Sequence, residues 1–131
     1  MEYTVFLNKA LENLAAAEIC LERGYHNASA NRAYYAMFQA AIAVLIHKGF
    51  ALPPDRIGHD WVQATFARTL TKQQKIFHRT YAGFLPDAQE IRNRADYSFA
   101  EVSKALCKSQ LSKTKSFFEV VLKELPHDFE S

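Results

Sequence analysis

A helical spacing of apolar residues runs along almost the whole chain and constrains its fold more than any other feature. Between Tyr3 and Leu21, apolar side chains recur at steps of three and four residues, which places them on one face of a helix. A second stretch begins near Asn27 or Ser29 and ends at Gly49. It carries apolar residues on two sides, so we expect a buried helix. No segment shows the alternation that is typical of a strand.

Helix-breaking residues divide the middle of the chain. The two prolines within residues 50–55 mark a loop, because proline does not fit a helix interior. Residues 57–70 then have the spacing of a third helix. The Thr-x-x-Gln pattern at residues 71–74 is a capping box and predicts that a fourth helix begins at about Lys72. Pro86 lies inside this fourth run and predicts a kink or a short break there.

The last part of the chain predicts one more helix. The Ser-x-x-Glu pattern at residues 98–101 is a second capping box, and the helical spacing that follows it ends at Pro126. The predicted fold is therefore an all-α, up-and-down bundle of four to five helices with short connections.

The composition fits one folded domain and excludes several other classes of protein. The 131 residues suit a single domain over residues 1–131, with an ordered core at about 3–125. Hydrophobic residues at 49% are too many for a disordered chain, and a net charge of +2 argues against nucleic-acid binding by bulk electrostatics alone. The longest apolar run, residues 40–46, is far shorter than the roughly 20 residues that span a bilayer. With no secretory signal visible, we expect a cytoplasmic protein without membrane contact.

The sequence lacks the common patterns of metal sites and activated nucleophiles. Cys20 and Cys107 stand alone in helical stretches, where we expect reduced and inert thiols. The histidines are scattered, and none has the spacing of a zinc ligand pair. A G-x-S-x-G motif and a glycine-rich phosphate loop are also missing. We therefore expect no metal and no cofactor.

A polar cluster interrupts the start of the second helix. Residues 31–38 read NRAYYAMF, with Arg32 one turn before Tyr35 and Asn31 one turn before Tyr34. An arginine in an otherwise apolar helix needs a partner, or it must reach the edge of the bundle. For Tyr35, a position in the apolar core is the simpler interpretation.

A second polar cluster ends the fourth predicted helix. Within residues 90–97, Arg92 and Asp96 are four residues apart, which is the spacing of a helix ion pair. Two interpretations remain open. Arg32, Arg92 and Asp96 form a structural network that fixes the helix register, or a ligand also uses these side chains.

Together the two clusters resemble the HEPN family, and within it the small stand-alone HEPN proteins. Ser29 and the eight-residue motif at 31–38 are followed far downstream by Arg92-x-x-Ala95-Asp96-Tyr97, just before the last long helix. The resemblance covers essentially the whole chain. It implies an all-α bundle that is often a homodimer. It also implies a partner protein, because many members are encoded beside a minimal nucleotidyltransferase and such pairs commonly act as toxin–antitoxin modules.

Many HEPN proteins are also metal-independent ribonucleases with an Arg-x(4–6)-His motif. In that chemistry a histidine moves a proton to or from the ribose 2′-OH, while the arginine holds the scissile phosphate. Here Arg92-Asn93 matches the start of the motif, but Tyr97 stands where the histidine is expected. No other arginine is followed at this spacing by a histidine. The sequence gives no reason to expect a more distant one, such as His59 or His78, at the site.

The replacement of histidine by Tyr97 changes the expected function. A phenol with a pKa of about 10 is almost entirely protonated near neutral pH and is a poor general base. The resemblance therefore implies a non-catalytic module that binds a nucleotide or an RNA phosphate. The alternative is a ribonuclease with an altered motif, in which Arg92 and Tyr97 are the candidate catalytic residues. A third hypothesis makes Tyr97 the acceptor of a nucleotide from a partner. The candidate phosphate-binding residues are Asn31, Arg32, Tyr34, Tyr35, Arg92, Arg94, Asp96 and Tyr97.

A basic stripe lies outside these clusters. Arg68, Lys72, Lys75 and Arg79 fall on one face if a helix continues through all of them. Such stripes are usually solvated helix faces, and a functional one would steer RNA or an acidic partner.

Overall fold

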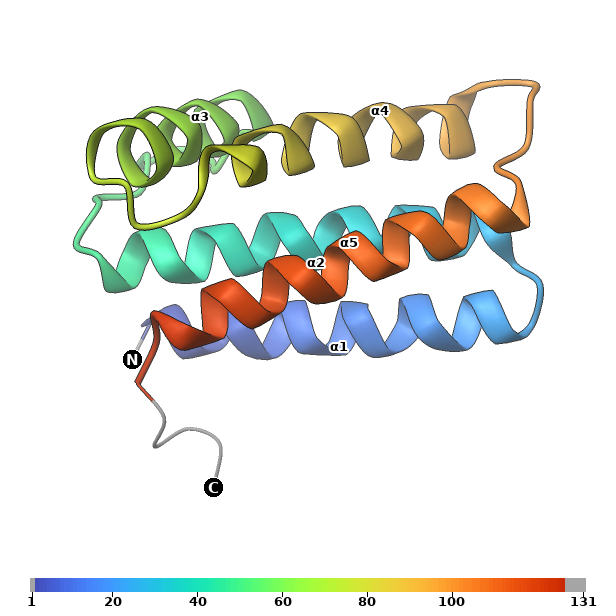
Figure 1. Ribbon diagram of the computed structural model, residues 1–131, viewed down its shortest axis with the longest axis horizontal. Coiled ribbons are helices and arrows are strands. Elements are labelled where there is room, and N and C mark those ends of the chain that lie inside the picture. The colour runs from blue at the N-terminus through green and yellow to red at the C-terminus, as the bar shows by residue number, and fades with distance from the viewer. Residues whose placement is uncertain (1, 127–131) are drawn as a thin grey trace.

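The computed structural model describes residues 2–126, and every regular element in that range is helical (Figure 1). The long helices are α1 (Glu2–Glu22), α2 (His26–His47), α4 (Phe84–Tyr97) and α5 (Lys104–Lys123). Three shorter elements join α2 to α4: α3 (His59–Thr65), the π-helix η1 (Phe66–Gln73) and the 3₁₀-helix η2 (Arg79–Gly83). The predicted all-α fold is confirmed.

The long helices run alternately up and down, with α2 at the centre (Figure 1). Helix α2 packs against α1, α4 and α5, which explains why its buried residues face several directions. Its many alanines let the neighbouring helices approach closely. No helix within residues 2–126 combines the length and the apolar character that crossing a membrane requires.

Aromatic side chains fill the core where the short elements meet the bundle. The ring centroid of Phe66, on η1, lies 5.2 Å from that of Phe77 and 5.4 Å from that of Phe117 on α5. All three side chains are buried. Pairs of rings at this spacing add about 0.5–1.5 kcal/mol beyond the area they bury. This contact fixes η1 against α5.

The segment between α3 and α4 differs from the prediction. The capping pattern at residues 71–74 does not begin a helix, because Thr71 lies inside η1 and its hydroxyl donates to the carbonyl oxygen four residues earlier, at 2.5 Å. The chain then turns at Lys75, whose φ is 55°. Helix α4 begins only at Phe84, so Pro86 lies in its first turn, where the missing N–H is tolerated.

The start of the last helix also differs from the prediction. Ser98 accepts a hydrogen bond from the N–H two residues later, within a turn, and α5 begins at Lys104. Its cap is Ser103, whose hydroxyl oxygen accepts from the N–H three residues later. Asn27, a predicted cap of α2, instead accepts from the N–H of Val102 at 2.9 Å. Its side chain thus joins the start of α2 to the segment before α5.

Candidate functional site

The two polar clusters of the sequence meet where α2 and α4 pack together. The side-chain amide of Asn31 donates to Asp96 Oδ2 at 2.9 Å, and Arg92 Nε donates to the same oxygen at 3.2 Å. Arg32 Nε donates to Asn31 Oδ1 at 2.9 Å. Arg32, Asn31, Asp96 and Arg92 thus form a continuous chain of hydrogen bonds across the two helices. This arrangement matches the structural network that is one of the two interpretations of the sequence, and it leaves open whether a ligand also uses these side chains.

The network continues from α2 to α1. Arg32 Nη1 donates to Asn13 Oδ1 at 3.0 Å, and Asn13 Nδ2 donates to Gln39 Oε1 at 2.7 Å. The guanidinium of Arg32 therefore donates hydrogen bonds to side-chain amide oxygens on both α1 and α2. Its role in the described structure is to hold helices together.

Aromatic rings surround the guanidinium of Arg92. Its Cζ lies 5.8 Å from the ring centroid of Tyr34, 5.5 Å from that of Tyr35 and 5.8 Å from that of Tyr97. Such contacts favour a cation over the ring faces. Burial alone lowers the pKa of Arg92, but hydrogen bonding to Tyr97 and Asp96 outweighs burial and raises this pKa. The site therefore holds a permanent positive charge in a fixed place.

Tyr34 connects this cation to the start of α3. The Tyr34 side chain is fully buried, and its Oη lies 2.5 Å from Nδ1 of His59. Gln63 Nε2 donates to the same Oη at 3.4 Å and to Gln89 Oε1 on α4 at 2.7 Å. Burial raises the pKa of Tyr34 to about 12, so its hydroxyl stays protonated. These contacts fix α3 against both α2 and α4.

His59 belongs to this site, although no sequence pattern predicts it there. Its ring centroid lies 4.7 Å from that of Phe38, 5.4 Å from that of Tyr34 and 6.1 Å from that of Tyr35. Burial lowers the pKa of His59, and the nearby charge of Arg92 lowers it further. An imidazole is therefore present beside Arg92, although the residues that follow Arg92 do not supply it. The loop before α3 is what brings His59 next to Tyr34 and Arg92.

Other predicted residues differ in how they relate to the site. Tyr35 is only partly buried, and its ring also lies 5.4 Å from Cζ of Arg32, so it is not simply a core residue. Tyr97 is 77% exposed at the edge of the site. Arg94 is exposed and, among the described residues, makes no hydrogen bond or ion pair with the network. His78 is also exposed and bonds to Thr80 instead.

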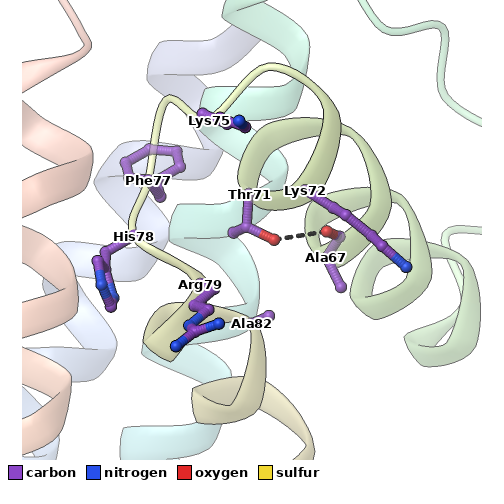
Figure 2. A pocket seen from close by; sticks show the side chains of 8 residues that line it. All are labelled: Ala67, Thr71, Lys72, Lys75, Phe77, His78, Arg79 and Ala82. Atoms are coloured by element: carbon purple, nitrogen blue, oxygen red, sulfur yellow. Dashed lines mark hydrogen bonds between the residues drawn. The ribbon is translucent and has the colours of Figure 1, made fainter.

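A separate cavity of about 650 Å³ lies between η1 and η2 (Figure 2). It is lined by Ala67, Thr71, Lys72, Lys75, Phe77, His78, Arg79 and Ala82. The expected basic stripe is broken here, because no single helix runs from residue 68 to residue 79. Instead, Lys72 on η1, Lys75 in the turn and Arg79 on η2 all line the same mostly apolar cavity.

Within residues 2–126, no three side chains of His, Cys, Asp or Glu gather closely enough to hold a metal ion.

Comparison with known proteins agrees with this architecture. A curated relative, "Putative toxin MJ0605" of Methanocaldococcus jannaschii, is 27% identical over 124 residues, which is 95% of this chain and 89% of the relative. The family model of the HEPN domain matches residues 3–125. The chain therefore belongs to the HEPN domain family.

Proposed function

We propose that this chain is a HEPN module that binds the phosphate of a nucleotide or of RNA at Arg92. The observation that supports the proposal best is a positioned guanidinium at an edge with exposed aromatic rings. Arginine binds phosphate through a planar fork of N–H groups. Tyr97 beside it is 77% exposed, and Phe99 is fully exposed, so both rings are free to stack on a base.

The charge balance of the network also favours an anion. Asp96 opposes a phosphate, but Arg92 offsets its charge and Arg32 adds a second cation to the same chain of hydrogen bonds. The bond to Asp96 uses Nε of Arg92. We expect the Nη groups of the guanidinium to donate to an incoming phosphate.

Binding of a labelled single-stranded RNA, and of AMP as a competitor, tests this proposal. We expect Arg92→Gln to weaken RNA binding at least tenfold, which corresponds to about 1.4 kcal/mol. Arg79→Gln is the matched control, because it removes the same charge at the cavity, and we expect it to bind as the unmodified protein does. Circular dichroism verifies that both variants fold. Equal losses in the two variants, or no binding by the unmodified protein, contradict the proposal.

We further propose that the chain acts in a toxin–antitoxin pair with a minimal nucleotidyltransferase. The name of the archaeal relative supports the toxin role. The exposure of Tyr97 supports its role as the acceptor of a transferred nucleotide. Intact mass after co-expression with the partner should show an added nucleotidyl group, and Tyr97→Phe should abolish it while Tyr25→Phe, at another exposed tyrosine, should not. An unmodified mass in the presence of an active partner contradicts this role.

We also propose a homodimer. Helix α1 leaves Val5, Leu11 and Ile19 exposed, and such apolar side chains are suited to an interface between two copies. Native mass spectrometry should show a dimer that Ile19→Glu weakens. A monomer at all concentrations contradicts the proposal.

A further inference from the structure

We propose that the cavity between η1 and η2 binds a small amphiphilic anion, whose hydrocarbon chain enters the cavity while its charged head lies among the exposed cations (Figure 2). The volume of about 650 Å³ is within the roughly 300–1,000 Å³ that small-molecule sites occupy. None of the residues that line the cavity belongs to the Arg92 network. This second site is therefore independent of the proposed phosphate site.

The wall of the cavity is suited to hydrocarbon. The Phe77 ring and Thr71 are buried, and Ala67 and Ala82 are partly buried. The hydroxyl of Thr71 donates to the carbonyl oxygen of Ala67, so this polar group already has its partner (Figure 2). A ligand that brought polar groups against this wall would lose hydrogen bonds to water without replacing them. An alkyl chain suits the wall better than a peptide backbone does.

The charges at the cavity select an anion. Lys72, Lys75 and Arg79 are exposed, and none of them forms an ion pair within residues 2–126. The eight residues that line the cavity include no aspartate or glutamate. Cations that gather without a carboxylate attract a negatively charged group. Two of the three are flexible ammonium groups, which recognise charge more than the shape of the head group.

The backbone around the cavity departs from the regular helix. The π-helix η1 spans Phe66–Gln73, and such segments are rare and frequent at functional sites. The carbonyl oxygen of Leu70 accepts from the N–H groups of Ile76 and Phe77, at 2.9 and 3.1 Å, which closes the turn after η1. Lys75 in this turn has a φ of 55°, which glycine adopts more easily. A lysine here places a charge at the cavity instead.

Calorimetric titration of the purified chain with decanoate, below the concentration at which it forms micelles, tests the proposal. We expect one decanoate per chain and a negative change in heat capacity, because apolar surface is buried. Each buried CH₂ group raises the affinity about fourfold, so hexanoate should bind at least tenfold more weakly than decanoate. Decanol, which has the same chain without the charge, should bind at least threefold more weakly.

Two sets of variants locate the ligand. Ala67→Leu fills the cavity and should weaken decanoate binding at least tenfold, whereas Ala64→Leu, at an exposed alanine of α3 outside the cavity, should not change it. The double variant Lys72→Gln with Lys75→Asn should bind decanoate no better than decanol, because asparagine tolerates positive φ and only the charges are lost. Lys113→Gln, at an exposed lysine of α5, is the control for charge.

Several results would overturn the proposal. Equal affinity for decanoate and decanol removes the role of the cations, and full binding by a folded Ala67→Leu removes the role of the cavity. Weaker decanoate binding by Arg92→Gln places the ligand at the other site. Binding to anionic phospholipid vesicles without binding of decanoate assigns the cations to a membrane surface. None of these results changes the expectation for RNA binding at Arg92, which is measured separately.

Discussion

Two regions of this bundle carry clustered positive charge beside aromatic rings, and they are built differently. At the first, the side chain of Arg92 is only 12% exposed and is held by a carboxylate and three tyrosine rings. At the cavity, Lys72, Lys75 and Arg79 are exposed, and none of them forms an ion pair within residues 2–126. Charge alone does not mark a binding site. A cation fixed in place before the ligand arrives loses less freedom on binding.

The difference follows from the backbone beneath each region. Regular α-helices place Arg92 and Asp96 one turn apart and align them with Asn31 on the neighbouring helix. The cavity is lined by a π-helix, a turn with positive φ at Lys75 and a short 3₁₀-helix, which share no common side-chain spacing. Regular elements thus supply the repeated geometry that a polar network needs.

The largest expected effect tests how firmly the cavity wall is supported. Phe66 is fully buried and contacts Phe77, which lines the cavity, so Phe66→Ala should lower the free energy of unfolding by about 3–5 kcal/mol. Urea denaturation measures this loss. Phe99→Ala, at a fully exposed ring two residues after Tyr97, should change it by less than about 0.5 kcal/mol. Similar values for the two variants contradict the described core.

The next prediction compares RNA binding after an arginine in each region is replaced by lysine, which keeps the positive charge. Arg92→Lys should weaken RNA binding roughly tenfold, because an ammonium group lacks the planar fork of a guanidinium. Arg79→Lys should leave binding unchanged, since Arg79 is exposed and has no fixed partner among residues 2–126. Fluorescence anisotropy at one salt concentration compares the pair. A larger loss of RNA binding in Arg79→Lys than in Arg92→Lys contradicts this prediction.

A smaller effect concerns pH and His59, the histidine beside Arg92. Because the pKa of His59 is lowered in the folded state, the unfolded chain binds the proton more readily. Stability should therefore fall as pH drops below the ordinary histidine pKa of about 6.5 toward the lowered value. Urea denaturation at several pH values should show a shallower fall in stability for His59→Gln than for the unmodified protein. Parallel curves for the two proteins exclude a lowered pKa of His59.

The smallest effects compare single charges in the two regions. Asp96→Asn removes an ion pair and weakens the acceptor for Asn31, so it should destabilise the fold by about 0.5–1 kcal/mol. Lys72→Gln should stay within about 0.5 kcal/mol of the unmodified protein. Thermal denaturation in low salt compares them. A greater loss in Lys72→Gln means that the cavity charges are structurally engaged.

The sequence predicts what depends on short-range spacing and misses what depends on the path of the chain. Helical periodicity predicts the all-α bundle, and the four-residue spacing predicts the pair of Arg92 and Asp96. The predicted fourth helix starts too early, because the Thr71 hydroxyl binds backbone within η1 instead of capping a new helix. His59 is missed because the loop before it folds back along α2, which no local pattern records.

The convergence of His59 and Arg92 has a consequence for the stage of folding at which the two side chains first meet. A contiguous motif carries its reactive groups as soon as one helix exists. Here the imidazole and the guanidinium come from distant parts of the chain and meet only through Tyr34. An unfinished or partly unfolded molecule cannot hold both together, so this pair of side chains exists only after α3 and α4 have docked on α2.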